Sequence, residues 1–234
     1  MSDEGRSTAP EDIMARWQAG RPEREAEWER AVAEAKRVAD AERERAWKWW
    51  WQSAAPLRYR DADMVRVDVP QLTEWLGDVM ATTNTAPPWL MLVGPTGRGK
   101  TYAAWALVRA LADLWRGDER DPFRLCAFST ADLLGRLRDI RACEDLHEAL
   151  AGCMVLLLDD LVTEGGLTSW EAQQIDRIIN ARYERDRLVI VTSNLPPAEL
   201  GRAVGERVAG RFAEACVVVP FTGVDRRRDG TSAP

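Results

Sequence analysis

The sequence predicts an α/β fold in which a parallel five-stranded sheet is flanked by helices and preceded by a helical N-terminal arm. Two observations support this prediction. Five short apolar runs alternate with helical patterns after residue 88, which is the order that parallel strands and their crossover helices produce. The first run leads directly into a glycine-rich loop and then into a helical pattern, as a phosphate-binding loop requires.

The N-terminal part of the chain differs in composition from the rest. Residues 1–10 are expected to be disordered, because they are polar and have almost no apolar side chains. Residues 11–55 are rich in Ala, Glu and Arg and are expected to form two helices, divided near Gly20 and Pro22. The balanced charges and narrow apolar stripe fit a solvated helix and a partner-docking arm about equally. Docking gains support from four neighbouring indoles, which are Trp47, Trp49, Trp50 and Trp51.

Apolar periodicity predicts the elements that follow the arm. The expected strands span residues 89–93, 123–129, 154–159, 188–193 and 216–219. The expected helices span residues 71–80, 131–141, 144–151, 170–185 and 202–214, together with one that follows the glycine loop and reaches Leu114.

Charge and composition exclude several kinds of protein. The net charge of −6 argues against a protein that coats nucleic acid through a uniformly basic surface, but it allows one basic face. No apolar run approaches the ~20 residues of a membrane span, so we expect a cytoplasmic protein without membrane contacts. His147 is the only histidine, which excludes a multi-histidine metal site, and we expect it to be exposed on a helix. The cysteines lack paired spacing and are expected to be reduced: Cys126, Cys143, Cys153 and Cys216.

The glycine loop fits G-x-x-x-x-G-K-[ST] and predicts a polyphosphate site. Its glycines allow backbone N–H groups to point inward, and the following helix start adds a partial positive charge. Lys100 is expected to neutralise the β- and γ-phosphates, and the Thr101 hydroxyl is expected to bind Mg²⁺. The alternative, a glycine turn before an ordinary helix, is disfavoured by the strand that precedes the loop. The loop consists of Gly94, Pro95, Thr96, Gly97, Arg98, Gly99, Lys100 and Thr101.

Two carboxylates end the apolar strand expected over residues 154–159. Asp159 is expected to hold Mg²⁺ beside the glycine loop. Asp160 stands where many P-loop ATPases carry a catalytic Glu that orients the attacking water. Because Asp is one methylene shorter, we expect turnover to be slow or to need a partner.

Three more polar residues are candidates for the site. Asn194 follows the apolar strand 188–193, so it would reach the γ-phosphate or the attacking water if the strand ends converge there. The alternative is a simple turn after the strand. Arg207 and Arg211 lie one helical turn apart on the same face. Unless they are merely solvated, they form a cationic edge that suits a phosphate on a neighbouring subunit.

These motifs together resemble the DnaC/IstB-like branch of the AAA+ ATPases. The likeness covers residues 56–227 and includes Arg58-Tyr59-Arg60-Asp61 before the core and the closing segment 219–226. The resemblance implies a P-loop AAA+ (ASCE-type) domain over these residues, without a C-terminal helical lid, and a flexible tail over 228–234. It implies ATP and Mg²⁺ as cofactors. By motif it assigns Walker A to Lys100 and Thr101, Walker B to Asp159 and Asp160, sensor 1 to Asn194, and the arginine finger to Arg211 with Arg207 as its neighbour.

The resemblance also implies a function. It implies an ATPase, stimulated by DNA or self-assembly, that loads a replicative helicase onto single-stranded DNA during replication initiation. Residues 11–55 would bind the helicase, and the cationic edge with Arg211 would contact a neighbouring copy of the chain. The alternative is a transposition helper that binds duplex DNA and recruits a transposase, and a small-molecule kinase is a distant third. Some loaders carry an N-terminal zinc module, which this chain lacks the cysteines to form before Cys126.

Overall fold

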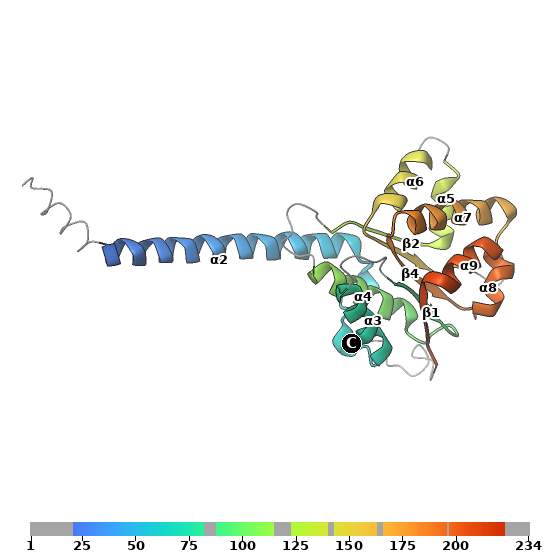
Figure 1. Ribbon diagram of the computed structural model, residues 1–234, viewed down its shortest axis with the longest axis horizontal. Helices are drawn as coiled ribbons and strands as arrows, with labels where there is room; N and C mark the ends of the chain where they lie inside the picture. The colour runs from blue at the N-terminus through green and yellow to red at the C-terminus, as the bar shows by residue number, and fades with distance from the viewer. Residues whose placement is uncertain are drawn as a thin grey trace, which may run out of the picture. The chain divides into compact units, whose positions relative to one another are not determined.

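The computed structural model describes residues 21–81, 88–114, 123–139, 143–162, 166–195 and 197–222 (Figure 1). The chain divides into two compact units, with the boundary between Trp50 and Trp51. Helix α2 (Arg21–Ala54) makes up the described part of the first unit, and its last residues belong to the second. Outside the described residues lie the expected disordered segment 1–10, the first expected arm helix and the expected tail.

Helix α2 begins at the position where the sequence predicts a break. Pro22 stands in its first turn, where the missing backbone N–H costs no hydrogen bond. Ion pairs one turn apart support the exposed helix, and they join Arg37 to Glu34 and Lys48 to Glu44. Several large apolar side chains of α2 are exposed, namely Trp28, Val32, Val38 and Trp49.

The second unit is built on a five-stranded sheet in the order β2-β3-β4-β1-β5, in which each neighbouring pair is parallel. The α/β prediction is therefore confirmed. The middle strands are continuous apolar runs because helices cover both of their faces. The strands are β1 (Trp89–Val93), β2 (Leu125–Ser129), β3 (Val155–Asp159), β4 (Leu188–Ser193) and β5 (Cys216–Pro220).

Helices form a layer on each face of the sheet (Figure 1). One layer contains α3 (Pro70–Ala81) and α4 (Lys100–Leu114), after two short 3₁₀ turns, η1 (Leu57–Tyr59) and η2 (Met64–Arg66). The other layer packs on the main apolar cluster, to which Met91, Leu156 and Val191 contribute from the sheet. Its helices are α5 (Thr130–Leu137), α6 (Cys143–Gly152), α7 (Ser169–Glu184), α8 (Pro197–Val204) and α9 (Glu206–Ala215).

Two expectations about this second layer are wrong. The single helix expected over residues 202–214 is two helices, α8 and α9, which meet at Gly205. Gly205 has a φ of +92°, which residues with a side chain rarely adopt, so the helix cannot continue through it. His147 is buried rather than exposed, because α6 packs on α7, and its Nε2 lies 2.9 Å from Gln174 Oε1. The sequence showed that His147 is helical but not which face is covered.

The four cysteines are free thiols. Within the described ranges, no helix combines the length and the apolar character needed to cross a membrane.

Candidate active site

The candidate residues meet at the carboxyl edge of the sheet. The glycine loop follows β1, Asp159 ends β3, and Asn194 follows β4, which lies between those two strands. Parallel strands bring their carboxyl ends to one edge, so residues about sixty and a hundred positions apart in the chain become neighbours.

The glycine loop has the backbone conformation of a phosphate cradle. Gly97 and Gly99 have φ values of +82° and +90°, a region that side-chain-bearing residues avoid. A Cβ atom at Gly94 would lie 2.2 Å from the backbone oxygen of Phe221, so only glycine fits there. The loop runs into α4 at Lys100, which places a helix N-terminus beside it.

The Lys100 side chain lies within this cradle and is almost fully buried. Its Nζ donates to the backbone oxygens of Gly94 and Pro95, at 2.6 and 2.9 Å, and to Asn194 Oδ1 at 2.9 Å. These three acceptors are uncharged. A phosphate oxygen would bind the ammonium group more strongly than they do, because charge-assisted hydrogen bonds are about twice as strong as neutral ones.

The two predicted metal ligands are in direct contact. Thr101 Oγ1 donates to Asp159 Oδ1 at 2.9 Å. A hydroxyl and a carboxylate oxygen are hard ligands of the kind that Mg²⁺ prefers. Across the described residues, no group of three or more His, Cys, Asp or Glu side chains could hold a metal ion. Thr101 and Asp159 are the residues that would hold Mg²⁺ here, since this ion is usually bound by only one or two protein carboxylates.

Asp160 and Asn194 form the third contact of the site. Asp160 has a φ of +58°, which is uncommon for a residue with a side chain and is typical of strained functional positions. Asn194 Nδ2 donates to Asp160 Oδ1 at 2.7 Å. Asn194 thus joins the lysine of the glycine loop to the second carboxylate through the two ends of one amide group.

Thr192 is a site residue that the sequence analysis missed. Its Oγ1 lies 2.7 Å from Asp159 Oδ1 and 2.8 Å from the backbone nitrogen of Asp160. The available signal was that an apolar strand ends in two polar residues, Thr192 and Ser193, directly before Asn194.

Arg207 and Arg211 are not joined to these residues. Arg207 is exposed and pairs with Asp176 of α7 at 3.4 Å. Arg211 donates to Asn180 Oδ1 at 3.2 Å, and its guanidinium lies 3.8 Å from the centroid of the Tyr183 ring. Neither arginine is bonded, within the described part of the chain, to the glycine loop or to the acidic pair. Their predicted roles concern a neighbouring subunit and remain predictions.

The position of Arg211 along the sheet explains this separation. Tyr183 contacts the ring of Trp89, with centroids 6.1 Å apart, and Trp89 is the first residue of β1. The glycine loop follows the last residue of β1. A five-residue strand is roughly 13–17 Å long, so Arg211 lies at the far end of β1 from the cradle.

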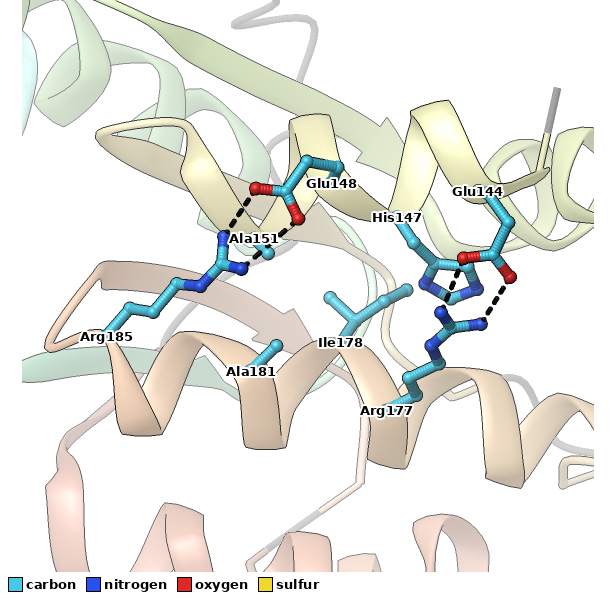
Figure 2. Close-up of a pocket in the computed structure, with 8 residues that line it drawn as sticks. All are labelled: Glu144, His147, Glu148, Ala151, Arg177, Ile178, Ala181 and Arg185. Carbon is cyan, nitrogen blue, oxygen red and sulfur yellow. Dashed lines mark hydrogen bonds and ion pairs between the residues drawn. The ribbon is translucent and has the colours of Figure 1, made fainter.

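A separate surface pocket of about 190 Å³ lies between α6 and α7 (Figure 2). Two bidentate ion pairs cross it, one between Arg177 and Glu144 and the other between Arg185 and Glu148. Hydrogen bonds from these arginines lower the pKa of both carboxyl groups. The pocket's charged groups are thus used to join the two helices, and we assign it no part in the phosphate site.

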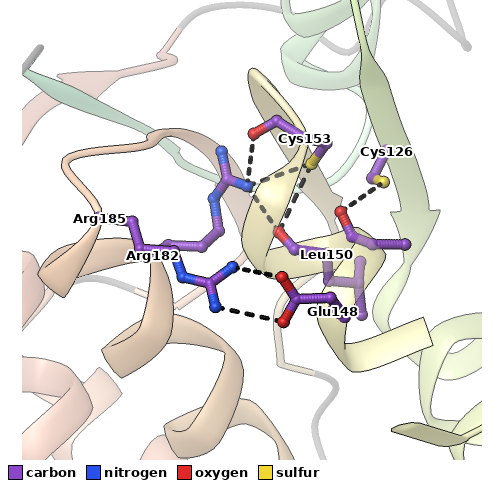
Figure 3. Close-up of polar contacts among 7 residues, drawn as sticks. Cys126, Glu148, Leu150, Cys153, Arg182 and Arg185 are labelled. Carbon is purple, nitrogen blue, oxygen red and sulfur yellow. Dashed lines mark hydrogen bonds and ion pairs between the residues drawn. The ribbon is translucent and has the colours of Figure 1, made fainter. Parts of the chain in front are cut away.

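A buried arginine organises the opposite edge of the sheet (Figure 3). Arg182 is inaccessible to solvent, and burial lowers its pKa. Its guanidinium donates to the backbone oxygens of Leu150, Cys153, Met154 and Leu188 and lies 3.1 Å from Cys153 Sγ. A hydrogen bond with Cys126 and the charge of Arg182 lower the pKa of the Cys153 thiol. This cluster ties α6 to the residues just before β3 and to the first residue of β4.

The fold and the site together define a P-loop protein of the AAA+ type. The parallel sheet, the cradle with Lys100 and the Thr101–Asp159 pair are the parts that this class uses to bind ATP. The chain matches the family described as IstB-like ATP binding protein over residues 79–221. It belongs to this family. No curated protein matches the chain by sequence.

Several solved structures share the fold. The DnaC helicase loader is 24% identical, with a TM-score of 0.59 over 71% of this chain and 100% of that one. DnaI is 20% identical, with a TM-score of 0.62 over 74% of this chain and 95% of that one. The initiator DnaA bound to AMPPCP and single-stranded DNA is 18% identical, with a TM-score of 0.57 over 72% of this chain and 52% of that one. The resemblance to the DnaC/IstB-like AAA+ proteins is thereby confirmed.

Proposed function

We propose that this protein is a cytoplasmic ATPase that loads a replicative DNA helicase onto single-stranded DNA. The observation that carries the ATPase part is the chain of contacts from Lys100 through Asn194 to Asp160. It connects the group that would bind the terminal phosphate to the group that would orient water. A phosphate that attracts Lys100 would release Asn194 Oδ1, so the state of the nucleotide could change the position of Asp160.

Each residue of the site has a distinct task in the proposed reaction. The backbone N–H groups of the glycine loop and Lys100 bind the β- and γ-phosphates. Thr101 and Asp159 hold Mg²⁺, which when bound neutralises charge on the phosphates. Asp160 accepts a hydrogen bond from the attacking water, and Asn194 fixes its carboxylate. Because the Asp160 carboxylate is one methylene shorter than that of Glu, we propose slow turnover without DNA or a neighbouring copy.

The partner-binding part of the proposal rests on helix α2. Its exposed indoles Trp28 and Trp49 are 71% and 72% accessible, and such side chains are typical anchors of protein interfaces. We therefore propose that the arm expected over residues 11–55 binds the helicase, through its part up to residue 50, because Trp51 belongs to the second unit. The structural likeness to a helicase loader, and to an initiator bound to single-stranded DNA, supports the choice of partners.

The second candidate function is a transposition helper that binds duplex DNA and recruits a transposase. The match to the IstB-like family supports it as strongly as the likeness to the loaders supports the first. The two functions share the ATP site and differ in what the arm and the assembled domain bind.

A retention experiment with the full chain separates them. The immobilised protein is exposed to the purified replicative helicase of its host or to a transposase, with ATP and either single-stranded or duplex DNA. The loader function predicts that the wild type retains the helicase and that a Trp28→Ala/Trp49→Ala double variant does not. Val65→Ala is the control, because Val65 is 93% exposed and lies outside the arm. Retention of the transposase but not of the helicase would refute the loader function.

A further inference from the structure

One buried hydroxyl group lies between the two acidic residues of the site. Thr192 is the fifth of the six residues of β4 and is 1% exposed. Its Oγ1 lies 2.7 Å from Asp159 Oδ1 and 2.8 Å from the backbone nitrogen of Asp160. The hydroxyl therefore lies within hydrogen-bond distance of both acidic residues.

The chemistry of the hydroxyl fixes the direction of both hydrogen bonds. The backbone N–H of Asp160 can only donate, so Thr192 Oγ1 must accept this bond. An ionised carboxylate can only accept, so the single hydroxyl proton of Thr192 must point to Asp159. One side chain therefore restrains a carboxylate and a backbone amide of adjacent residues at the same time.

Each bond restrains a group that the proposed reaction needs. Asp159 Oδ1 accepts from Thr101 as well as from Thr192, so the carboxylate is held from β4 and from the start of α4. The second bond satisfies the amide of Asp160 in its left-handed conformation. That conformation places the Asp160 carboxylate within 2.7 Å of Asn194 Nδ2.

We propose that Thr192 is a positioning residue for the metal-binding carboxylate of Asp159 and for the backbone of Asp160. The inference rests on the proposed ATPase function and deepens it. Thr192 contacts neither nucleotide nor metal under this proposal. It acts by presenting Asp159 to Mg²⁺ in a fixed orientation, as the outer hydrogen-bond partners of metal ligands do.

The next residue of the chain provides a matched control. Ser193 is also fully buried, but its hydroxyl bonds to the backbone of Leu195, at 3.1 Å to the nitrogen and 3.3 Å to the oxygen. Its hydroxyl supports the turn after β4 and touches neither carboxylate. Ser193→Ala therefore removes a buried hydroxyl from the same strand without disturbing the acidic pair.

The test compares three variants of the full chain, which are Thr192→Val, Thr192→Ser and Ser193→Ala. Binding of a fluorescent ADP analogue is measured first in EDTA and then during titration with Mg²⁺. We expect all three to bind the analogue in EDTA as the wild type does. Thr192→Val is expected to need about 10–100-fold more Mg²⁺ for the half-maximal metal effect, the usual loss when an outer partner of a metal ligand is removed. Thr192→Ser, which keeps the hydroxyl, and Ser193→Ala are expected to need wild-type Mg²⁺ concentrations.

Two results would overturn the proposal. One is a folded Thr192→Val variant with the Mg²⁺ requirement of the wild type. The other is a Thr192→Ser variant as impaired as Thr192→Val, which would show that packing and not the hydroxyl matters. Thr192→Ala replaces Thr192→Val in the same titration if the valine does not fit. Failure of the wild type itself to bind the nucleotide would refute the proposed ATPase function, a result distinguishable from either of these.

Discussion

Replacement of Trp51 by Ala is expected to destabilise the second unit, although Trp51 belongs to a helix whose earlier turns are exposed. The Trp51 side chain is 4% accessible, and its indole N–H donates to the backbone oxygen of Arg60 at 2.8 Å. Its ring meets Trp105 edge-on, with the centroids 6.0 Å apart. Trp105 lies in α4, the helix that begins at Lys100, so Trp51 packs against the helix that carries the phosphate cradle.

The expected effect follows from this burial. Removal of a buried aromatic side chain costs about 3–5 kcal/mol. In a unit of this size each kcal/mol changes Tm by about 2–4 °C, so Trp51→Ala should lower Tm by roughly 6–20 °C. Trp51→Phe keeps a ring in the core and loses mainly the hydrogen bond, which is worth about 1 kcal/mol. Its Tm should therefore fall by only about 2–4 °C.

Scanning calorimetry of the full chain measures the transition of the second unit. Trp49→Ala is the matched control, because Trp49 is 72% exposed and a surface substitution usually changes stability by less than about 0.5 kcal/mol. Equal Tm values for Trp51→Ala and Trp49→Ala would refute the burial argument. For the same reason we propose that the arm ends at residue 50 rather than 55, so a truncated protein should start at residue 51.

The other predictions concern the ATP site. Lys100→Ala should lose at least about tenfold in ATP affinity, because the cradle then lacks its main counter-charge; a folded variant that binds ATP like the wild type in equilibrium titration would contradict the P-loop assignment. Asp159→Asn should keep nucleotide binding in EDTA and lose Mg²⁺-dependent phosphate release. Unchanged release would show that Asp159 is not the metal ligand. Arg211→Ala should bind ATP normally but lose turnover in assemblies by about 10³-fold or more if it acts on a neighbour. Mixing it with Lys100→Ala should restore some turnover, since one variant keeps the pocket and the other keeps the arginine; a co-assembled mixture without activity would show that Arg211 does not act between subunits.

The separation of Arg211 from the cradle bears on this last experiment. Within one chain Arg211 is held by Asn180 and Tyr183 at the far end of β1. An arginine in that place could reach a phosphate only on another copy of the chain. The same position would also suit a purely structural arginine that joins α9 to α7, and mixing the two variants separates these roles.

Local patterns in the sequence determined the fold class and most of the site. A short apolar run between turns can be recognised without its neighbours in space. The predicted bounds of β1 and β4 therefore equal the observed ones. The glycine loop is equally local, because its conformation depends on the absence of Cβ atoms at particular positions. Once the strands were known to be parallel, their carboxyl ends had to meet, which brought Asp159, Asp160 and Asn194 to one edge.

Only the tertiary structure decided which side chains of a given type are buried and bonded. Trp49 and Trp51 are two residues apart and have the same side chain, yet Trp49 is exposed and Trp51 is buried against Trp105 of α4. The sequence predicted that His147 lies on a helix. It is buried because α6 packs on α7, which only the tertiary structure shows. Thr192 forms its hydrogen bonds to Asp159 and Asp160 because β4 lies beside β3. The order of strands in a sheet cannot be predicted from local sequence patterns. Hydrogen bonds between strands depend on which strands become neighbours, and that is settled by packing of the whole sheet.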